Sequence, residues 1–312
     1  KVAPADYAID PTVFGKFRDN VPAILRALNI IEPEAVLPIV TLLKTGIRIG
    51  ELAALSSAQI QVGNNKTRLT IDRNLNCDGV IGKTKNRLTR HIVADVELGR
   101  DLLSYAAEKK RSHSEPIFQT ITKPRSALSA RKRPGRIASA PDRLQATLRG
   151  RWIEAQYLAA GWLSSTLGYK LSKLPKPVEQ FTAAELEDTV KLRFDWSRKG
   201  GAAIGNGCRL YDHDFETRDE AAAFAGVRLF GLHDCRHLYA SQLLAENVPL
   251  SRVARRLGDT EAVVSRFYAH YLPEDDEADQ ADIEAINSID LGLNFVQSSV
   301  AGSQSPASSD LH

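Results

Sequence analysis

The order of apolar and polar positions divides most of the chain into helical stretches. Residues 10–30 repeat apolar side chains near helical spacing, behind Asp10 as a possible cap and Pro11 at the first turn, and so predict a helix. A mostly apolar stretch at 33–45 predicts a second, buried helix, and 46–60 predicts a third after a glycine turn. Further helices are predicted at 97–111, 143–160, 182–197, 219–226, 233–246, 249–257 and 260–270.

The periodicity changes in one region near the first third of the chain. Residues 67–73 and 90–96 alternate between apolar and polar side chains and are rich in β-branched residues, which predicts two strands. The stretch CDGVIGKTKNR between them predicts a basic connection. Residues 198–215 are rich in glycine and irregular, so they predict a loop. The expected fold class is therefore mainly α with a small antiparallel β-sheet (α+β).

Composition places this chain of 312 residues among globular proteins. Hydrophobic residues make up 43% and charged residues 25%, enough for a core and too apolar for a disordered chain. No run of about 18 apolar residues predicts a membrane span. The cysteines, Cys77, Cys208 and Cys235, are far apart and suggest neither a disulfide framework nor a metal site, so a cytoplasmic location is expected. The chain has no methionine, which suggests a fragment that lacks an N-terminal domain.

The formal net charge of +3 hides two regions of opposite sign. Residues 274–312 contain nine acidic residues and no lysine or arginine. The remaining 1–273 therefore carry 41 basic and 29 acidic residues, a net charge of +12. A basic body with an acidic tail favours a polyanionic partner for the body.

One segment, 123–151, concentrates this positive charge, with nine basic residues and one acid. It reads either as a solvated basic loop or as an arm that contacts the phosphates of a nucleic acid. The candidate DNA-binding residues are Lys123, Arg125, Arg131, Lys132, Arg133 and Arg136.

Three local patterns carry possible chemistry. In KTGIRIGELAAL, a glycine turn delivers Arg48 to the start of a helix with Glu51 three residues later, an arrangement that also fits an ordinary surface ion pair. In LHDCRHLYASQLL, His233 and Arg236 share one helical face and could grip an anion, because a guanidinium is suited to phosphate. In RRLGDTEAVVSRFYAHYLP, Tyr268 ends a helical segment among basic residues, a place where most tyrosines belong to the core.

Taken in this order, the three patterns resemble the catalytic motifs of the tyrosine recombinases, also called phage-type integrases. TGIRIGEL resembles the first-arginine motif of that family, HDCRHLYAS its HxxR motif, and LGD with FYAH its final segment. GKTK resembles the β-hairpin that holds the family's catalytic lysine. The resemblance covers about 35–110 and 228–272. It implies a site-specific DNA recombinase or integrase that works through a covalent 3′-phosphotyrosyl intermediate, without a metal or cofactor.

The resemblance also implies residue roles. Arg48 and Arg236 would hold the non-bridging oxygens of the scissile phosphate, and Tyr268 would attack phosphorus. His233 would hydrogen-bond the phosphate or assist proton transfer. Lys83 would protonate the leaving 5′-oxygen, with Lys85 as the alternative.

Glu51 would orient the region of the first arginine without touching the phosphate itself.

Two features depart from the family pattern. Asp259 stands where the family usually has His or Trp. Its carboxylate would repel a phosphate unless it is protonated or turned toward Arg or His. His270 could partly substitute for the missing His or Trp. The interval from Arg48 to His233 is nearly twice the usual one, which predicts an insertion within about 120–228 of a catalytic domain at 1–292.

The C-terminal region has two interpretations. Residues 277–293 could form a helix, with Ile283, Ile286 and Ile289 as its apolar stripe, that passes to a neighbouring protomer in a tetramer on double-stranded DNA. Alternatively, that helix docks on its own chain, ahead of a flexible tail at 293–312. A type IB topoisomerase-like enzyme and a catalytically weak DNA-binding protein of the same fold are the competing functions.

Overall fold

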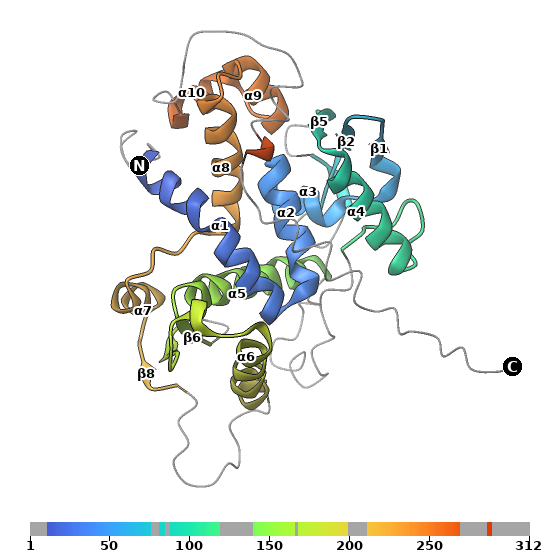
Figure 1. Cartoon of the computed structure of the whole chain (residues 1–312). Coiled ribbons are helices and arrows are strands. Elements are labelled where there is room, and N and C mark those ends of the chain that lie inside the picture. Colours follow the sequence, from blue (N-terminus) through green and yellow to red (C-terminus); the bar gives the residue numbers. More distant parts are fainter. Residues whose placement is uncertain are drawn as a thin grey trace, which may run out of the picture.

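The computed structural model describes residues 11–75, 81–84, 88–118, 140–165, 168–198, 211–268 and 286–288 (Figure 1). The described chain is mainly α-helical with small antiparallel sheets, which confirms the predicted fold class. Its α-helices are α1 Pro11–Ile31, α2 Val36–Thr45, α3 Ile49–Ala54, α4 Val96–Glu108, α5 Ala140–Ala159, α6 Ala183–Arg198, α7 Arg218–Ala225, α8 Leu232–Ala245, α9 Leu250–Leu257 and α10 Glu261–Tyr268. Its strands are β1 Ile60–Val62, β2 Thr67–Ile71, β3 Arg73–Leu75, β4 Ile81–Lys83, β5 Arg90–Ala94, β6 Trp162–Ser164, β7 Lys170–Lys173 and β8 His213–Asp214. No helix in these ranges is long and apolar enough to cross a membrane.

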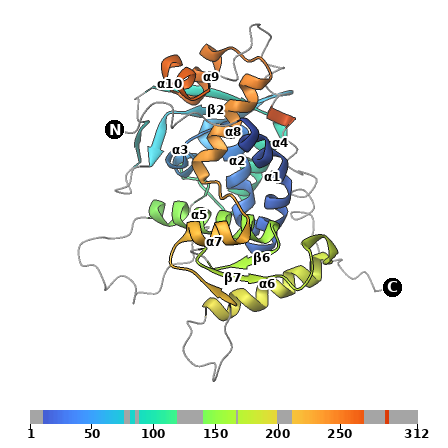
Figure 2. The ribbon, with the colours of Figure 1, turned by 90° about the vertical axis from the view of Figure 1, so that its left-hand side faces the viewer.

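The centre of the molecule is built on α2 and α8, which pack against each other (Figures 1 and 2). Every residue of α2 is buried, as its nearly continuous apolar sequence predicts. Helix α1 packs along α5, and Phe17 of α1 stacks on Phe230 with ring centroids 4.0 Å apart. These contacts belong to one large core cluster that extends from α1 to the start of α8.

The sheet β1–β2–β5 is antiparallel, with Thr70 opposite His91, and α4 lies against it. Strands β2 and β5 confirm the two strands that alternation predicts. Strand β1 was not predicted, and the third helix is shorter than 46–60 because it ends at Ala54. There the Gln59 side chain accepts the backbone N–H of Ser56 at 2.9 Å, which ends helical hydrogen bonding and turns the chain into a 3₁₀ helix, Ser57–Gln59.

The interval in which an insertion is predicted contains α5, β6, β7, α6, β8 and α7. Figure 2 shows these elements gathered at one end of the molecule, away from α9 and α10. Helix α5 also contributes to the main core, because Leu144, Leu148 and Trp152 belong to the same buried cluster as Phe17. The prediction of a loop over 198–215 is wrong near its C-terminal end, because His213–Asp214 forms an edge strand beside β7. Residues 199–210 of this predicted loop lie outside the described residues.

The turn between α2 and α3 requires a glycine where it meets α8. Gly46 has a left-handed backbone (φ 61°), and a Cβ there would lie 2.5 Å from Cδ1 of Tyr239 on α8. We expect Gly46→Ala to lower the free energy of unfolding by about 2–4 kcal/mol, the combined cost of a strained backbone and overpacking. Urea denaturation measures this loss.

The matched control is Gly226→Ala, which shares the left-handed backbone (φ 66°) but has no heavy atom within 4 Å of the added carbon. It should cost only about 1–2 kcal/mol, from the backbone alone. Equal losses in the two variants would show that the contact between Gly46 and Tyr239 does not constrain the fold.

Candidate active site

The first predicted site residue, Arg48, lies directly ahead of α3. Gly46 ends α2, and the chain then extends through Arg48 (φ −74°, ψ 151°), whose backbone N–H donates to the Glu51 carboxylate at 2.8 Å. The Arg48 guanidinium reaches the same carboxylate at 3.4 Å, and its side chain is 23% exposed. Arg48 is therefore fixed at its backbone while its guanidinium faces a partly solvated space.

The second arginine, Arg236, lies on α8 and is almost completely buried. Its guanidinium donates to the backbone carbonyls of Gly46 at 2.6 Å and Leu257 at 2.7 Å. One contact joins α8 to the turn before α3, and the other joins it to the end of α9. The position of the guanidinium is thus set by two backbone segments far apart in the sequence.

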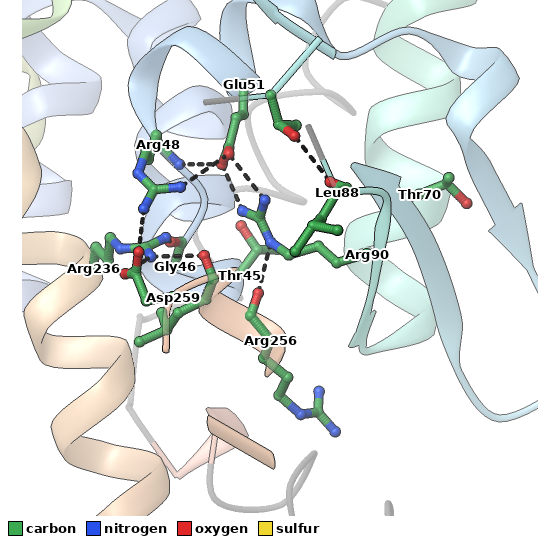
Figure 3. A network of polar contacts seen from close by, with 12 residues as sticks. Thr45, Gly46, Arg48, Glu51, Thr70, Leu88, Arg90, Arg236, Arg256 and Asp259 are labelled. Carbon is green, nitrogen blue, oxygen red and sulfur yellow. Dashed lines mark hydrogen bonds and ion pairs between the residues drawn. The ribbon is translucent and has the colours of Figure 1, made fainter. Parts of the chain in front are cut away.

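The two guanidiniums meet at a single carboxylate, that of Asp259 (Figure 3). Arg48 donates to Oδ1 and Arg236 to Oδ2, both at 2.5 Å. Burial alone would raise the pKa of Asp259, but the positive charge of Arg236, and then that of Arg48, outweighs it and the pKa is lowered. The carboxylate is therefore ionised at neutral pH and bridges the two cations.

A buried ion pair lies next to this bridge and contacts Arg48. Arg90 of β5 donates to both oxygens of Glu51, at 2.9 and 2.6 Å, and to the backbone carbonyl of Arg256 at 2.8 Å. Burial would raise the pKa of Glu51, but its hydrogen bond and charge pairing with Arg90, together with the contacts from Arg48, lower it. Glu51 thus links α3 to the sheet, and Arg90 links the sheet to the end of α9 next to Asp259.

Tyr268 is the last residue of α10, and its side chain is buried. Its hydroxyl forms a hydrogen bond with Nδ1 of His237, the residue that follows Arg236 on α8. Burial, followed by the charges of His233 and Arg236, lowers the pKa of His237 to about 4, so its ring is neutral at neutral pH. The His233 and His237 rings stand edge to face, with centroids 4.8 Å apart.

The structure brings together some of the predicted residues and not others. Arg48, Arg236, Asp259 and Glu51 form one network, while Tyr268 and His233 both adjoin His237. Lys83 lies exposed on β4 opposite Arg73, in a hairpin whose other strand, β3, packs against α3; no polar contact joins Lys83 to the network within the described ranges. Two further predicted residues and the six DNA-binding candidates lie outside the described residues: Lys85, His270, Lys123, Arg125, Arg131, Lys132, Arg133 and Arg136.

Two residues of the site were not predicted. Arg90 occupies an inward position of a predicted strand, where a buried arginine signals a buried partner charge. His237 follows Arg236 in the sequence, but it lies outside the HxxR motif and was therefore not a candidate. In the described part of the chain, no group of three or more His, Cys, Asp or Glu side chains could hold a metal ion.

No family model matches the chain, and no curated protein matches it. A solved structure of the XerH site-specific recombinase, bound to its difH substrate in a pre-cleavage complex, is 13% identical with a TM-score of 0.39. The alignment covers 86% of this chain and 51% of that one, so the chain spans about half the length of the recombinase. A similarity at this level carries no argument about function.

The bridge between the arginines gives a direct prediction. Asp259→Asn removes the negative charge that lies between two guanidiniums and offsets their repulsion. The substitution should lower the free energy of unfolding by roughly 1–3 kcal/mol. The lowered pKa means that Asp259 stabilises the fold above its unfolded pKa of about 4, and that this contribution is lost as pH falls through the lower folded value. The variant should therefore lose less stability than the wild type on acidification, as measured by urea denaturation between pH 7 and pH 3.

Asp214→Asn is the matched control, because Asp214 pairs with Lys170 at 2.8 Å while both side chains are more than half exposed. It should change stability by less than about 1 kcal/mol. If Asp259→Asn behaves like this control at every pH, the bridging carboxylate does not hold the arginines together.

Proposed function

We propose that this protein cleaves and rejoins DNA strands through a covalent phosphotyrosyl intermediate, as a tyrosine recombinase does. The observation that carries the proposal is the convergence of Arg48 and Arg236 on one bridging anion. A phosphodiester also carries one negative charge and two equivalent oxygens. The space between the guanidiniums thus suits the scissile phosphate, with one arginine on each non-bridging oxygen.

Such an arrangement supports catalysis as well as binding. In the transition state of phosphoryl transfer, negative charge builds on the equatorial oxygens. Guanidiniums held in place before the reaction stabilise that charge more than the ground state. Arg236 is held by two carbonyls and Arg48 by Glu51, so neither group must reorganise when the charge develops.

Tyr268 is the proposed nucleophile, and His237 is its proposed proton acceptor. A phenol has a pKa of about 10 and attacks poorly until its proton is removed. Without a bound anion, the pKa of about 4 makes His237 a weak base that only hydrogen-bonds the phenol through Nδ1. The negative charge of a bound phosphate would raise this pKa and so let Nδ1 accept the phenolic proton. The phenolic oxygen then forms a bond to phosphorus, the bond from phosphorus to the 5′-oxygen breaks, and the leaving oxygen takes a proton.

The proton for the leaving 5′-oxygen is assigned to the hairpin lysine, Lys83 or its neighbour Lys85. His233 is assigned a hydrogen bond to the phosphate, because its ring is close enough to Arg236, Arg48 and Asp259 to interact with their charges. One phosphoester bond replaces another at each step, so the strand can be rejoined by reversal, without an external energy source.

Asp259 and Tyr268 define what must change before cleavage. The Asp259 carboxylate must leave at least one arginine for the phosphate to enter, and Tyr268, only 3% exposed, must reach the phosphate. This form is therefore assigned to the enzyme without DNA. The same two facts favour a second candidate, a DNA-binding protein of this fold that does not cleave.

The proposed partner is double-stranded DNA, since the body carries a net charge of +12. Assembly into a tetramer on DNA and a nucleoid location are part of the proposal. Ile286, from the segment considered for exchange between protomers, is buried in a cluster with residues of α8, α9 and α10 of its own chain, and Ser288 accepts a hydrogen bond from Gln242 at 2.9 Å. Exchange would therefore begin by releasing this contact.

A nicked suicide substrate tests the enzymatic proposal. A duplex enriched for binding from a random pool would be nicked at successive positions, so that a cleaved fragment diffuses away and traps the covalent complex. The wild type should form an adduct that resists denaturation, and Tyr268→Phe should reduce it to background with DNA binding retained. Arg48→Ala should slow adduct formation by about 10²–10³-fold.

Tyr169→Phe, which alters an exposed tyrosine on the loop before β7, is the matched control and should form the adduct as the wild type does. An adduct that survives Tyr268→Phe would show that another residue is the nucleophile. Binding without an adduct at any nick position would support the second candidate.

A further inference from the structure

A cavity of about 360 Å³ opens beside Arg48 and His233, on the side that faces α5 and α7. Its wall combines the turn before α3, the segment that leads into α8, one face of α5 and the first residue of α7. Helix α5 packs against both α3 and α8, and Figure 2 shows α5 and α7 directly below them. The cavity thus joins the proposed phosphate site to the region of the predicted insertion.

The α5 residues in the wall follow helical spacing. Gln145, Arg149 and Trp152 lie at intervals of four and three residues, so they form one stripe toward the cavity. The sequence of this helix therefore combines a cation, an amide and an indole on a single face. The opposite part of the wall is the N-terminal end of α8, where backbone N–H groups contribute partial positive charge.

The lining is cationic and contains no carboxylate. Arg149 and Arg218 are exposed, and neither forms an ion pair with a carboxylate within the described residues. Together with Arg48 they place three arginines in the wall of one small space. Arg48 alone is already engaged, by Asp259 and Glu51, so Arg149 and Arg218 are available for a second anion.

The inner wall is apolar. It is formed by Ile49, Leu229 and Phe230 in front of the fully buried Trp152. The volume falls near the lower end of the range of about 300–1,000 Å³ for small-molecule pockets, which suits one nucleotide and excludes a duplex segment.

We propose that this cavity binds the nucleotide next to the scissile phosphate, with its flanking phosphate held by Arg149 and Arg218. Its sugar and unstacked base lie against the apolar wall formed by Ile49, Leu229 and Phe230. This inference rests on the proposed function, because it places the scissile phosphate at Arg48 and Arg236. It gives α5 and α7 a role in positioning the strand, since phosphate contacts fix the register of a protein on DNA.

The test separates nucleotide binding from strand cleavage. The probe is thymidine 3′,5′-bisphosphate, and its affinity is measured by calorimetry for the wild type, Arg149→Gln/Arg218→Gln and Tyr268→Phe. The double arginine variant should bind roughly tenfold more weakly or worse, because two charged hydrogen bonds are lost. Tyr268→Phe should bind as the wild type does.

Two further variants sharpen the result. Arg100→Gln, an exposed arginine of α4 outside the cavity, controls for a general loss of charge and should leave the affinity unchanged. Gln145→Trp should weaken binding by filling the cavity without changing charge. Equal affinities of the wild type and the double arginine variant, or an equal loss in Arg100→Gln, would overturn the proposal.

The suicide substrate then distinguishes the two proposals. A bisphosphate affinity that depends on Arg149 and Arg218, in a protein that forms no adduct, would support the nucleotide site and reject strand cleavage. An adduct that forms at the wild-type rate in the double arginine variant, with unchanged bisphosphate affinity, would reject the nucleotide site and leave strand cleavage intact.

Discussion

The structure depends on a single electrostatic constraint, which is that two guanidiniums must be kept close together. Arg48 and Arg236 carry like charges. Arg48 directly precedes α3, and Arg236 of α8 donates to the carbonyl of Gly46 in the turn before it. Asp259 resolves the repulsion by giving one oxygen to each. The surrounding contacts serve this arrangement: Gly46 and Leu257 accept from Arg236, and the Glu51–Arg90 pair ties α3, the sheet and the end of α9 into one frame.

The same constraint connects stability with the proposed function. A site built to hold a phosphate is unstable when empty, because its cations repel each other and are partly desolvated. A carboxylate supplied by the protein stabilises the empty site, and a phosphate that enters must compete with it. Under the proposed function, Asp259 would stabilise the protein without DNA and weaken DNA binding at the same time. The His or Trp usual at this position in tyrosine recombinases would not have these two opposing effects.

The sequence predicts the main helices and the central motif residues because those signals are local. The apolar stretch of α2 and the spacing of His233 and Arg236 each lie within one helix. Strands β6, β7 and β8 were missed because strands of two to four residues are too short to show alternation. Their pairing depends on contacts between distant segments, which no local pattern encodes.

The rest of the site could not be predicted for the same reason. The sequence shows that Asp259 departs from the tyrosine recombinase motif that this segment resembles, but it does not show that both arginines hold the carboxylate. His237 contacts Tyr268 only because α10 folds back onto α8. The cavity brings Arg149 and Arg218 beside Arg48, from helices that are far apart along the chain.

Under the proposed function, an anion of phosphate shape binds between Arg48 and Arg236. The most direct measurement is the anomalous diffraction of crystals of the Asp259→Asn variant soaked in tungstate, a tetrahedral oxyanion with a strong anomalous signal. We expect a tungsten peak between the two guanidiniums, in the place that the carboxylate occupies in the wild type. Guanidiniums that move apart, with no peak between them, would contradict it.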